Sequence, residues 1–112
     1  MNANRRRGEI VATLDGRSCR LCLTLGTLAE LESAYEADDL GALVARFSGG
    51  RLSALDLIRI VGAGLRGGGE AVTDEAVGAM QCEGGVAVFA AFVSELLTAT
   101  FGAAEGAAGQ NP

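Results

Sequence analysis

The sequence contains no histidine and no lysine, and it has only three cysteines. Without an imidazole, the chain lacks the commonest general base near neutral pH, which excludes serine-histidine and cysteine-histidine catalysis. An odd number of cysteines does not form a complete disulfide framework, so we expect free thiols in a reducing compartment. No segment reaches the roughly 18 uncharged apolar residues of a membrane span, and no signal-peptide run follows the polar N-terminus. We therefore expect a cytoplasmic protein with no membrane partner.

What the chain does have is many small apolar residues and an excess of negative charge. Its hydrophobic fraction is 49%, it contains 17 glycines, and its net charge is -5. This composition is typical of a folded protein, and 112 residues are enough for one core. An acidic protein repels the phosphate backbone unless its basic residues cluster. Because the cluster at residues 5–7, Arg5, Arg6 and Arg7, is interpreted as a solvated terminal run, no nucleic-acid partner is expected.

Residues 8–25 predict a β-hairpin, because two β-rich runs flank Asp15 and Gly16, a pair suited to a type I′ turn. Pairing Leu14 with Arg17 separates an apolar face from a more polar one. The apolar face carries Ile10, Ala12, Cys19, Leu21 and Leu23, and the other face carries Val11, Thr13, Ser18, Arg20 and Thr24. An isolated two-stranded ribbon is only marginally stable, so helices must cover it.

Capping residues and helical periodicity predict the helices that follow. Thr27 and Glu30 form a capping box that opens a first helix, and Asp39 caps a short second one. Ser53 caps a third helix, with Asp56 placed favourably for the helix dipole. This third helix is apolar on more than one side, which makes it the candidate for the centre of the core.

Two more helices complete the expected fold. Thr73 opens a fourth helix that should run to about Gln81, and a strongly apolar last helix should span about 86–101. The fold class is therefore α+β, mainly α, with the N-terminal hairpin packed on four to five helices in a single domain at 8–101.

The two ends of the chain differ from this domain in composition. The basic N-terminus, residues 1–7, and the Ala/Gly-rich tail, residues 102–112, lack the large apolar side chains that a core needs. Both are expected to be disordered.

Three patterns resemble functional motifs but match structural roles better. Cys19 and Cys22 have C-x-x-C spacing, yet residues three apart on a strand point to opposite faces, so no metal site is expected. The glycine-rich run at 62–69 follows a helix and lacks the lysine of a phosphate loop, which favours a helix C-terminus with a flexible hinge. The acidic pairs at 38–39 and 74–75 match helix capping. The sequence thus predicts no active site, cofactor or small-molecule substrate, and no enzyme.

Four phrases of the sequence carry a resemblance to a known family. They are NRRRGE at 4–9, LTLGTLAELE at 23–32, LDLIRI at 55–60 and GAGLR at 62–66. These phrases resemble the small proteins encoded in the tail region of gene transfer agents and related phages, and the likeness covers about residues 4–101. That family is grouped with phage tail assembly chaperones, and some descriptions attach it to the tail tube. The resemblance implies a role in tail morphogenesis and supplies no functional residues to carry over.

Among the roles that the resemblance implies, helical content favours a tail assembly chaperone. Tail tube subunits of long-tailed phages are generally β-sandwiches that stack into rings, whereas this chain predicts one hairpin and about four helices. We expect a non-enzymatic chaperone that binds the tape measure protein, or the tail tube protein, and shields apolar helices until assembly.

Two alternatives to the chaperone stay open. The first is a structural tail component, a tube or terminator subunit that is found in the particle and forms rings with copies of itself. The second, with less support, is a small DNA-binding regulator, whose third helix would offer only Arg59 and Arg66 to DNA.

The expected partner surface lies on the outer face of the hairpin or along the last helix. Val11 and Thr13 represent the hairpin face. Phe92 represents the last helix, which has more apolar residues than one buried stripe requires. We predict that partner binding involves Val11, Thr13 and Phe92.

Overall fold

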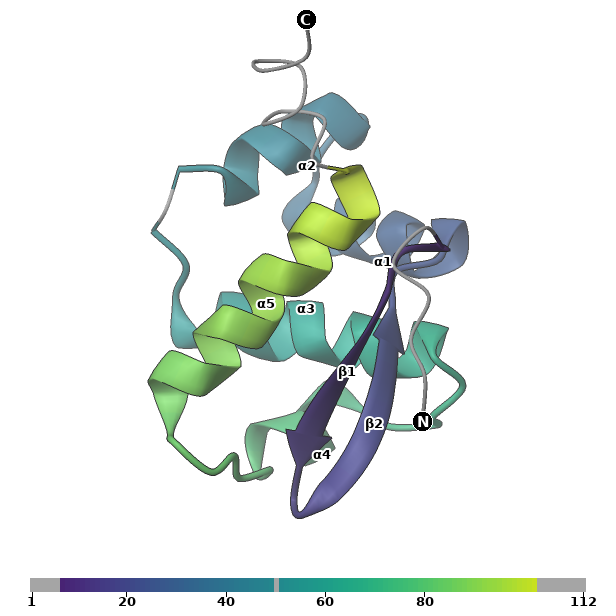
Figure 1. Ribbon diagram of the computed structural model, residues 1–112. Coiled ribbons are helices and arrows are strands. Elements are labelled where there is room, and N and C mark those ends of the chain that lie inside the picture. The colour runs from purple at the N-terminus through teal and green to yellow at the C-terminus, as the bar shows by residue number, and fades with distance from the viewer. Residues whose placement is uncertain (1–6, 50, 103–112) are drawn as a thin grey trace, which may run out of the picture.

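The computed structural model describes residues 7–49 and 51–102 of the chain (Figure 1). Within these residues, an antiparallel hairpin of β1 (Glu9–Leu14) and β2 (Arg17–Cys22) is followed by five helices. The helices are α1 (Leu25–Tyr35), α2 (Leu40–Phe47), α3 (Ala54–Gly67), α4 (Asp74–Gly78) and α5 (Val86–Phe101). The mainly helical α+β fold is thus confirmed. The terminal segments expected to be disordered, 1–7 and 102–112, lie outside the described residues except for Arg7 and Gly102.

The hairpin has the register that its sequence predicts. Leu14 pairs with Arg17 and Ile10 pairs with Leu21. Both turn residues have positive φ, 53° at Asp15 and 75° at Gly16, as a type I′ turn requires. The apolar face is buried, and its residues are Ile10, Ala12, Leu14, Cys19, Leu21 and Leu23. The hairpin therefore presents one complete apolar face to the helices.

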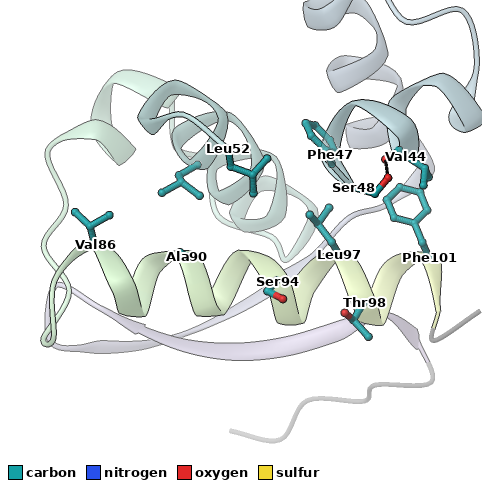
Figure 2. Close-up of a pocket in the computed structure, with 11 residues that line it drawn as sticks. Val44, Phe47, Ser48, Leu52, Val86, Ala90, Ser94, Leu97, Thr98 and Phe101 are labelled. Carbon is teal, nitrogen blue, oxygen red and sulfur yellow. Dashed lines mark hydrogen bonds between the residues drawn. The ribbon is translucent and has the colours of Figure 1, made fainter. Parts of the chain in front are cut away.

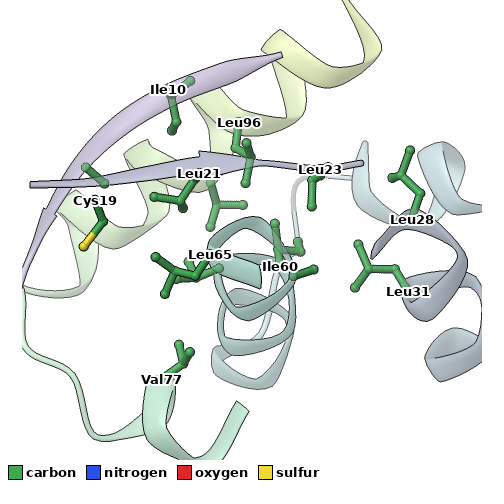
Figure 3. Close-up of a cluster of buried hydrophobic side chains, with 14 of the residues drawn as sticks. Ile10, Cys19, Leu21, Leu23, Leu28, Leu31, Ile60, Leu65, Val77 and Leu96 are labelled. Atoms are coloured by element: carbon green, nitrogen blue, oxygen red, sulfur yellow. The ribbon is translucent and has the colours of Figure 1, made fainter. Parts of the chain in front are cut away.

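Helix α3 lies at the centre of the core, as expected. Ser53 accepts a hydrogen bond from the Asp56 amide, and the Asp56 carboxylate accepts one from the Ser53 amide, which completes a capping box. Figure 3 shows Leu65 of α3 between β2 and α4, while Ile60 lies toward Leu31 of α1. The hairpin and helices α1, α4 and α5 thus pack directly on α3, and α2 contacts it through the ion pair of Arg46 with Asp56.

Glycines bring α3 unusually close to β2. A Cβ atom built on Gly67 would overlap the carbonyl oxygen of Cys22, and one on Gly68 would overlap the carbonyl oxygen of Arg20. The run at 62–69 was expected to form a helix end with a flexible hinge. Helix α3 does end within this run, at Gly67, and the close backbone contact holds Gly67 and Gly68 against the strand where a hinge was expected.

The first helix begins two residues earlier than expected. The Thr24 hydroxyl accepts a hydrogen bond from the Thr27 amide at 3.2 Å, so Thr24 is the N-cap and α1 starts at Leu25. The predicted capping box of Thr27 and Glu30 is wrong, because the Glu30 carboxylate accepts hydrogen bonds from Arg66 instead. The Glu30 carboxylate therefore makes a long-range ion pair in place of a local hydrogen bond.

The fourth helix ends at Gly78, earlier than the predicted end near Gln81. The Asp15 amide donates to the Gln81 carbonyl, and the Gln81 amide donates to the Asp15 carboxylate, both at 2.8 Å. These bonds tie the chain after α4 to the hairpin turn. They occupy the backbone groups that a longer helix would use.

Candidate functional site

An apolar groove separates α5 from α2 and from the beginning of α3 (Figure 2). Its volume is about 550 Å³. Figure 2 shows Leu97 and Phe101 of α5 pointing toward Phe47 and Val44 of α2 across this groove. The lining residues are Val86, Ala90, Ser94, Leu97, Thr98 and Phe101 of α5, with Val44, Phe47, Ser48, Leu52 and Leu57 on the other side.

Helix α5 supplies one wall because its sequence is apolar nearly all round, with Glu95 as its one charged residue. Val93 and Leu96 are fully buried on the side that faces the core. A second stripe returns every three or four residues on another side of the helix, which is the helical period. This stripe consists of Val86, Ala90, Ser94, Leu97 and Phe101. Helix α5 therefore buries one apolar face and presents a second one to the groove.

Helix α2 forms part of the opposite wall and is held in place by a polar cluster. Arg46 pairs with Asp56 at 3.1 Å, and the Tyr35 hydroxyl donates a hydrogen bond to the same carboxylate. The Tyr35 ring meets the Phe47 ring edge to face, with centroids 5.3 Å apart, and the Arg59 guanidinium lies 5.0 Å from the Tyr35 centroid. We call Tyr35, Arg46, Asp56 and Arg59 the Asp56 cluster. It joins α1, α2 and α3 beside the groove.

The electrostatics of the Asp56 cluster suit a fixed structural joint. Burial alone would raise the pKa of the Asp56 carboxyl, but hydrogen bonds from Tyr35 and Ser53 and the charge of Arg46 outweigh it and lower that pKa. Burial, together with the hydrogen bond to Asp56, raises the pKa of Tyr35 to about 12. Asp56 is therefore ionised and Tyr35 neutral across the neutral range, so the cluster keeps one charge state.

Sequence reasoning missed this cluster. It assigned Asp56 only to the dipole of its own helix. The partners come from three helices, and no local spacing brings Tyr35, Arg46 and Asp56 together. The sequence did show that the last helix has more apolar residues than one buried stripe requires, and this helix supplies one wall of the groove.

The three residues predicted to bind a partner do not line the groove. Thr13 is exposed and Val11 is half-buried on the outer hairpin face. Phe92 is half-buried and packs against the core, on a different side of α5 from the groove stripe. The prediction for Val11, Thr13 and Phe92 stays untested, but the groove lies elsewhere on the molecule.

Both arginines of α3 are engaged within the fold. Arg59 lies over the Tyr35 ring. Arg66 pairs with Glu30 of α1 and with Asp74 of α4, each at 3.0 Å. A recognition helix needs such side chains to reach base edges, so these contacts weigh against a DNA-binding role for α3.

On the hairpin, Cys19 and Cys22 take separate positions, as strand geometry predicts. Cys19 is buried in the core, whereas Cys22 is half-buried and its thiol donates toward the Arg7 carbonyl at 3.7 Å. Burial raises the pKa of both thiols.

In the part of the chain that the structure describes, no group of Cys, Asp and Glu side chains is arranged to hold a metal ion. No helix in these ranges is long and apolar enough to cross a membrane.

The part of the chain that the structure describes is thus a small hairpin-and-helix domain with an open apolar groove. The comparison with family models then gives its family. Residues 7–103 match the family described as phage tail tube protein, GTA-gp10. Because the match spans most of the chain, the protein belongs to this family of phage tail proteins. Among curated proteins and among solved structures, nothing matches the chain.

The family description confirms the phage tail and gene transfer agent context that the sequence resemblance implied. It names the tail tube, which favours the structural alternative over the assembly chaperone that helical content had favoured. That earlier preference assumed that a tube subunit is a β-sandwich. The family places a tail tube description on a chain with a two-stranded hairpin and helices.

Proposed function

We propose that the protein is a non-enzymatic structural subunit of a phage-like tail and binds neighbouring tail proteins through the groove between α5 and α2. The observation that carries this proposal is the second apolar face of α5. Val86 in this face is 72% exposed although its side chain is a large apolar one. Contiguous apolar surface on a folded domain is typical of a protein contact, and the family description supplies the tail context.

The rigidity of the groove supports a repeated structural contact. Its α2 wall is fixed by the ion pair of Arg46 with Asp56 and by burial of Leu43 and Phe47. A preformed site loses less conformational entropy on binding than a mobile one. A subunit that makes the same contact many times in one particle benefits from such a fixed site.

An assembly chaperone is the second candidate, and the groove gives it some support. An amphipathic helix, such as a segment of the tape measure protein, can place its apolar residues in a groove between helices. In that role the protein would bind transiently in the cytoplasm and leave before the particle matures. The structural subunit instead stays in the particle beside other tail proteins.

Copy number in purified particles separates the two candidates. The protein would be quantified by mass spectrometry in cell lysate and in purified particles, against a capsid protein as internal standard. The structural role predicts many copies per particle. Presence in lysate with absence from particles would overturn it and support the chaperone.

A further inference from the structure

Leu25 is the most exposed large apolar side chain among the described residues, at 79%. It stands in the first turn of α1. The other three such side chains, Leu40, Leu55 and Val86, lie on α2, α3 and α5, which all contribute to the groove. No residue of α1 lines the groove. The chain therefore presents an apolar protrusion and an apolar groove on different elements.

The surroundings of Leu25 allow another surface to approach it closely. Gly26 and Ala29, its neighbours on α1, are both exposed and small, so the leucine side chain projects beyond them. In Figure 1, α1 lies at the right of the molecule, whereas the segment between α2 and α3, which borders the groove, lies at the left. Leu25 is not among the residues that line the groove of its own copy.

We propose that the first turn of α1 in one copy docks in the groove of the next copy, with Leu25 entering between α5 and α2. This inference rests on the proposed function, because a tail subunit that is present in many copies has a second copy as its nearest partner. A contact between two different surfaces is heterologous, so it repeats from copy to copy and builds a ring or an open stack. Both are arrangements that a tail can use.

Charges beside the two surfaces favour this pairing. Glu32 follows Leu25 by two helical turns on the same side of α1, and Glu36 ends the helix. On the groove side, Arg51 is exposed next to the lining residue Leu52. Opposite charges at the edges of two apolar surfaces steer them together and oppose the reversed contact.

A two-fold contact between the α5 stripes of two copies is the competing arrangement. It would cover the groove, but it would leave Leu25 exposed and would close at a dimer. The two arrangements therefore differ in whether Leu25 matters and in whether assembly continues beyond two copies.

The test uses two variants of the full chain that each damage one surface. Leu25→Asp places a charge on the protrusion, and Ala90→Trp fills the groove. Leu55→Asp, an exposed leucine outside the groove lining, and Ala91→Trp, an exposed neighbour on α5, are the matched controls. Circular dichroism establishes that each variant is folded, and sedimentation velocity across a concentration series measures its mass.

The heterologous contact predicts a specific pattern of masses. The unmodified protein and both controls form species larger than a dimer, and each surface variant alone is monomeric. A mixture of Leu25→Asp and Ala90→Trp forms a one-to-one dimer, because one intact groove meets one intact protrusion. Its mass is twice that of a monomer and does not grow with concentration.

Three results would overturn the contact. They are an unmodified protein that stays monomeric, a Leu25→Asp variant that associates as well as the unmodified protein, and a mixture that stays monomeric. Copy number in particles is independent of all three. Many copies per particle with any of these results would reject the contact alone. A one-to-one dimer with no copies in particles would reject the tail role and keep the contact.

Discussion

The hairpin side and the groove side of this molecule are built from similarly apolar sequence but are packed to opposite extents. On the hairpin side, α3 approaches β2 so closely that Gly67 has no room for a methyl group. On the other side, α5 and α2 leave an open groove of about 550 Å³. The difference teaches that the closest packing and the uncovered apolar surface lie on different sides of the fold. Substitutions should therefore separate stability from assembly.

The largest expected loss of stability comes from adding a methyl group where α3 contacts β2. In Gly67→Ala, the new Cβ overlaps the Cys22 carbonyl, which is backbone and cannot rotate away. We expect the free energy of unfolding to fall by about 3 kcal/mol, the upper end for overpacking. Urea denaturation measures this loss. Gly49→Ala is the control, because nothing lies within 4 Å of its added methyl group. Equal, small effects of both substitutions would contradict the account of this contact.

The Asp56 cluster should come next. Asp56→Asn keeps the shape of the side chain but removes the negative charge of the carboxylate. That carboxylate pairs with Arg46 and accepts a hydrogen bond from the Tyr35 hydroxyl. Arg46 is partly exposed, so water screens part of this loss, and we expect about 2 kcal/mol. Tyr35→Phe removes one hydroxyl and should cost about 1 kcal/mol. Denaturation of both variants gives their ranking, and a larger loss for Tyr35→Phe would show that Asp56 is not the centre of the cluster.

The same cluster predicts how stability depends on pH. Because folding lowers the pKa of Asp56, its contribution is present above the unfolded value and is lost as pH falls through the folded value. Tyr35 has its pKa raised to about 12, so its contribution is present below the unfolded value and is lost as pH rises toward 12. The stability difference between the unmodified protein and Asp56→Asn should therefore shrink below about pH 4, near the unfolded carboxyl pKa. Denaturation at several pH values measures it, and a constant difference would refute the assignment.

The smallest expected effect on stability is on the groove side. Val86→Asp changes an exposed residue at the start of α5, where a carboxylate suits the helix dipole. Its free energy of unfolding should stay within about 0.5 kcal/mol of the unmodified value. Its incorporation into particles should fall at least about tenfold, as expected when a groove contact loses about 1.4 kcal/mol. If Val86→Asp lost stability but was still incorporated into particles, the groove side would serve stability and not assembly, which would contradict this account.

The sequence predicted those parts of the fold that local chemistry decides. The Asp15-Gly16 turn fixed the hairpin register, and Asp39 and Ser53 capped their helices as expected. The errors arose where distant residues compete for the same groups. Glu30 accepts hydrogen bonds from Arg66 and does not form the predicted capping box. The Gln81 amide donates to the Asp15 carboxylate, and α4 ends before Gln81.

The candidate site was predictable only in part. The apolar excess of the last helix indicated a second exposed face. Phe92, named from that helix, lies on a different side from the groove stripe, and its role in partner binding stays a prediction. The opposite wall depends on α2, whose position is set by the cluster of Tyr35, Arg46 and Asp56 from three helices. Their meeting is a property of the tertiary fold, and no spacing within one segment encodes it.

The most direct test of the central claim is to count copies of the protein in purified particles from cells that make either the unmodified chain or Val86→Asp. The account predicts many copies of the unmodified chain per particle, and a Val86→Asp variant that is folded and abundant in lysate but depleted from particles. Absence of the unmodified chain from particles, or full incorporation of Val86→Asp, would contradict it.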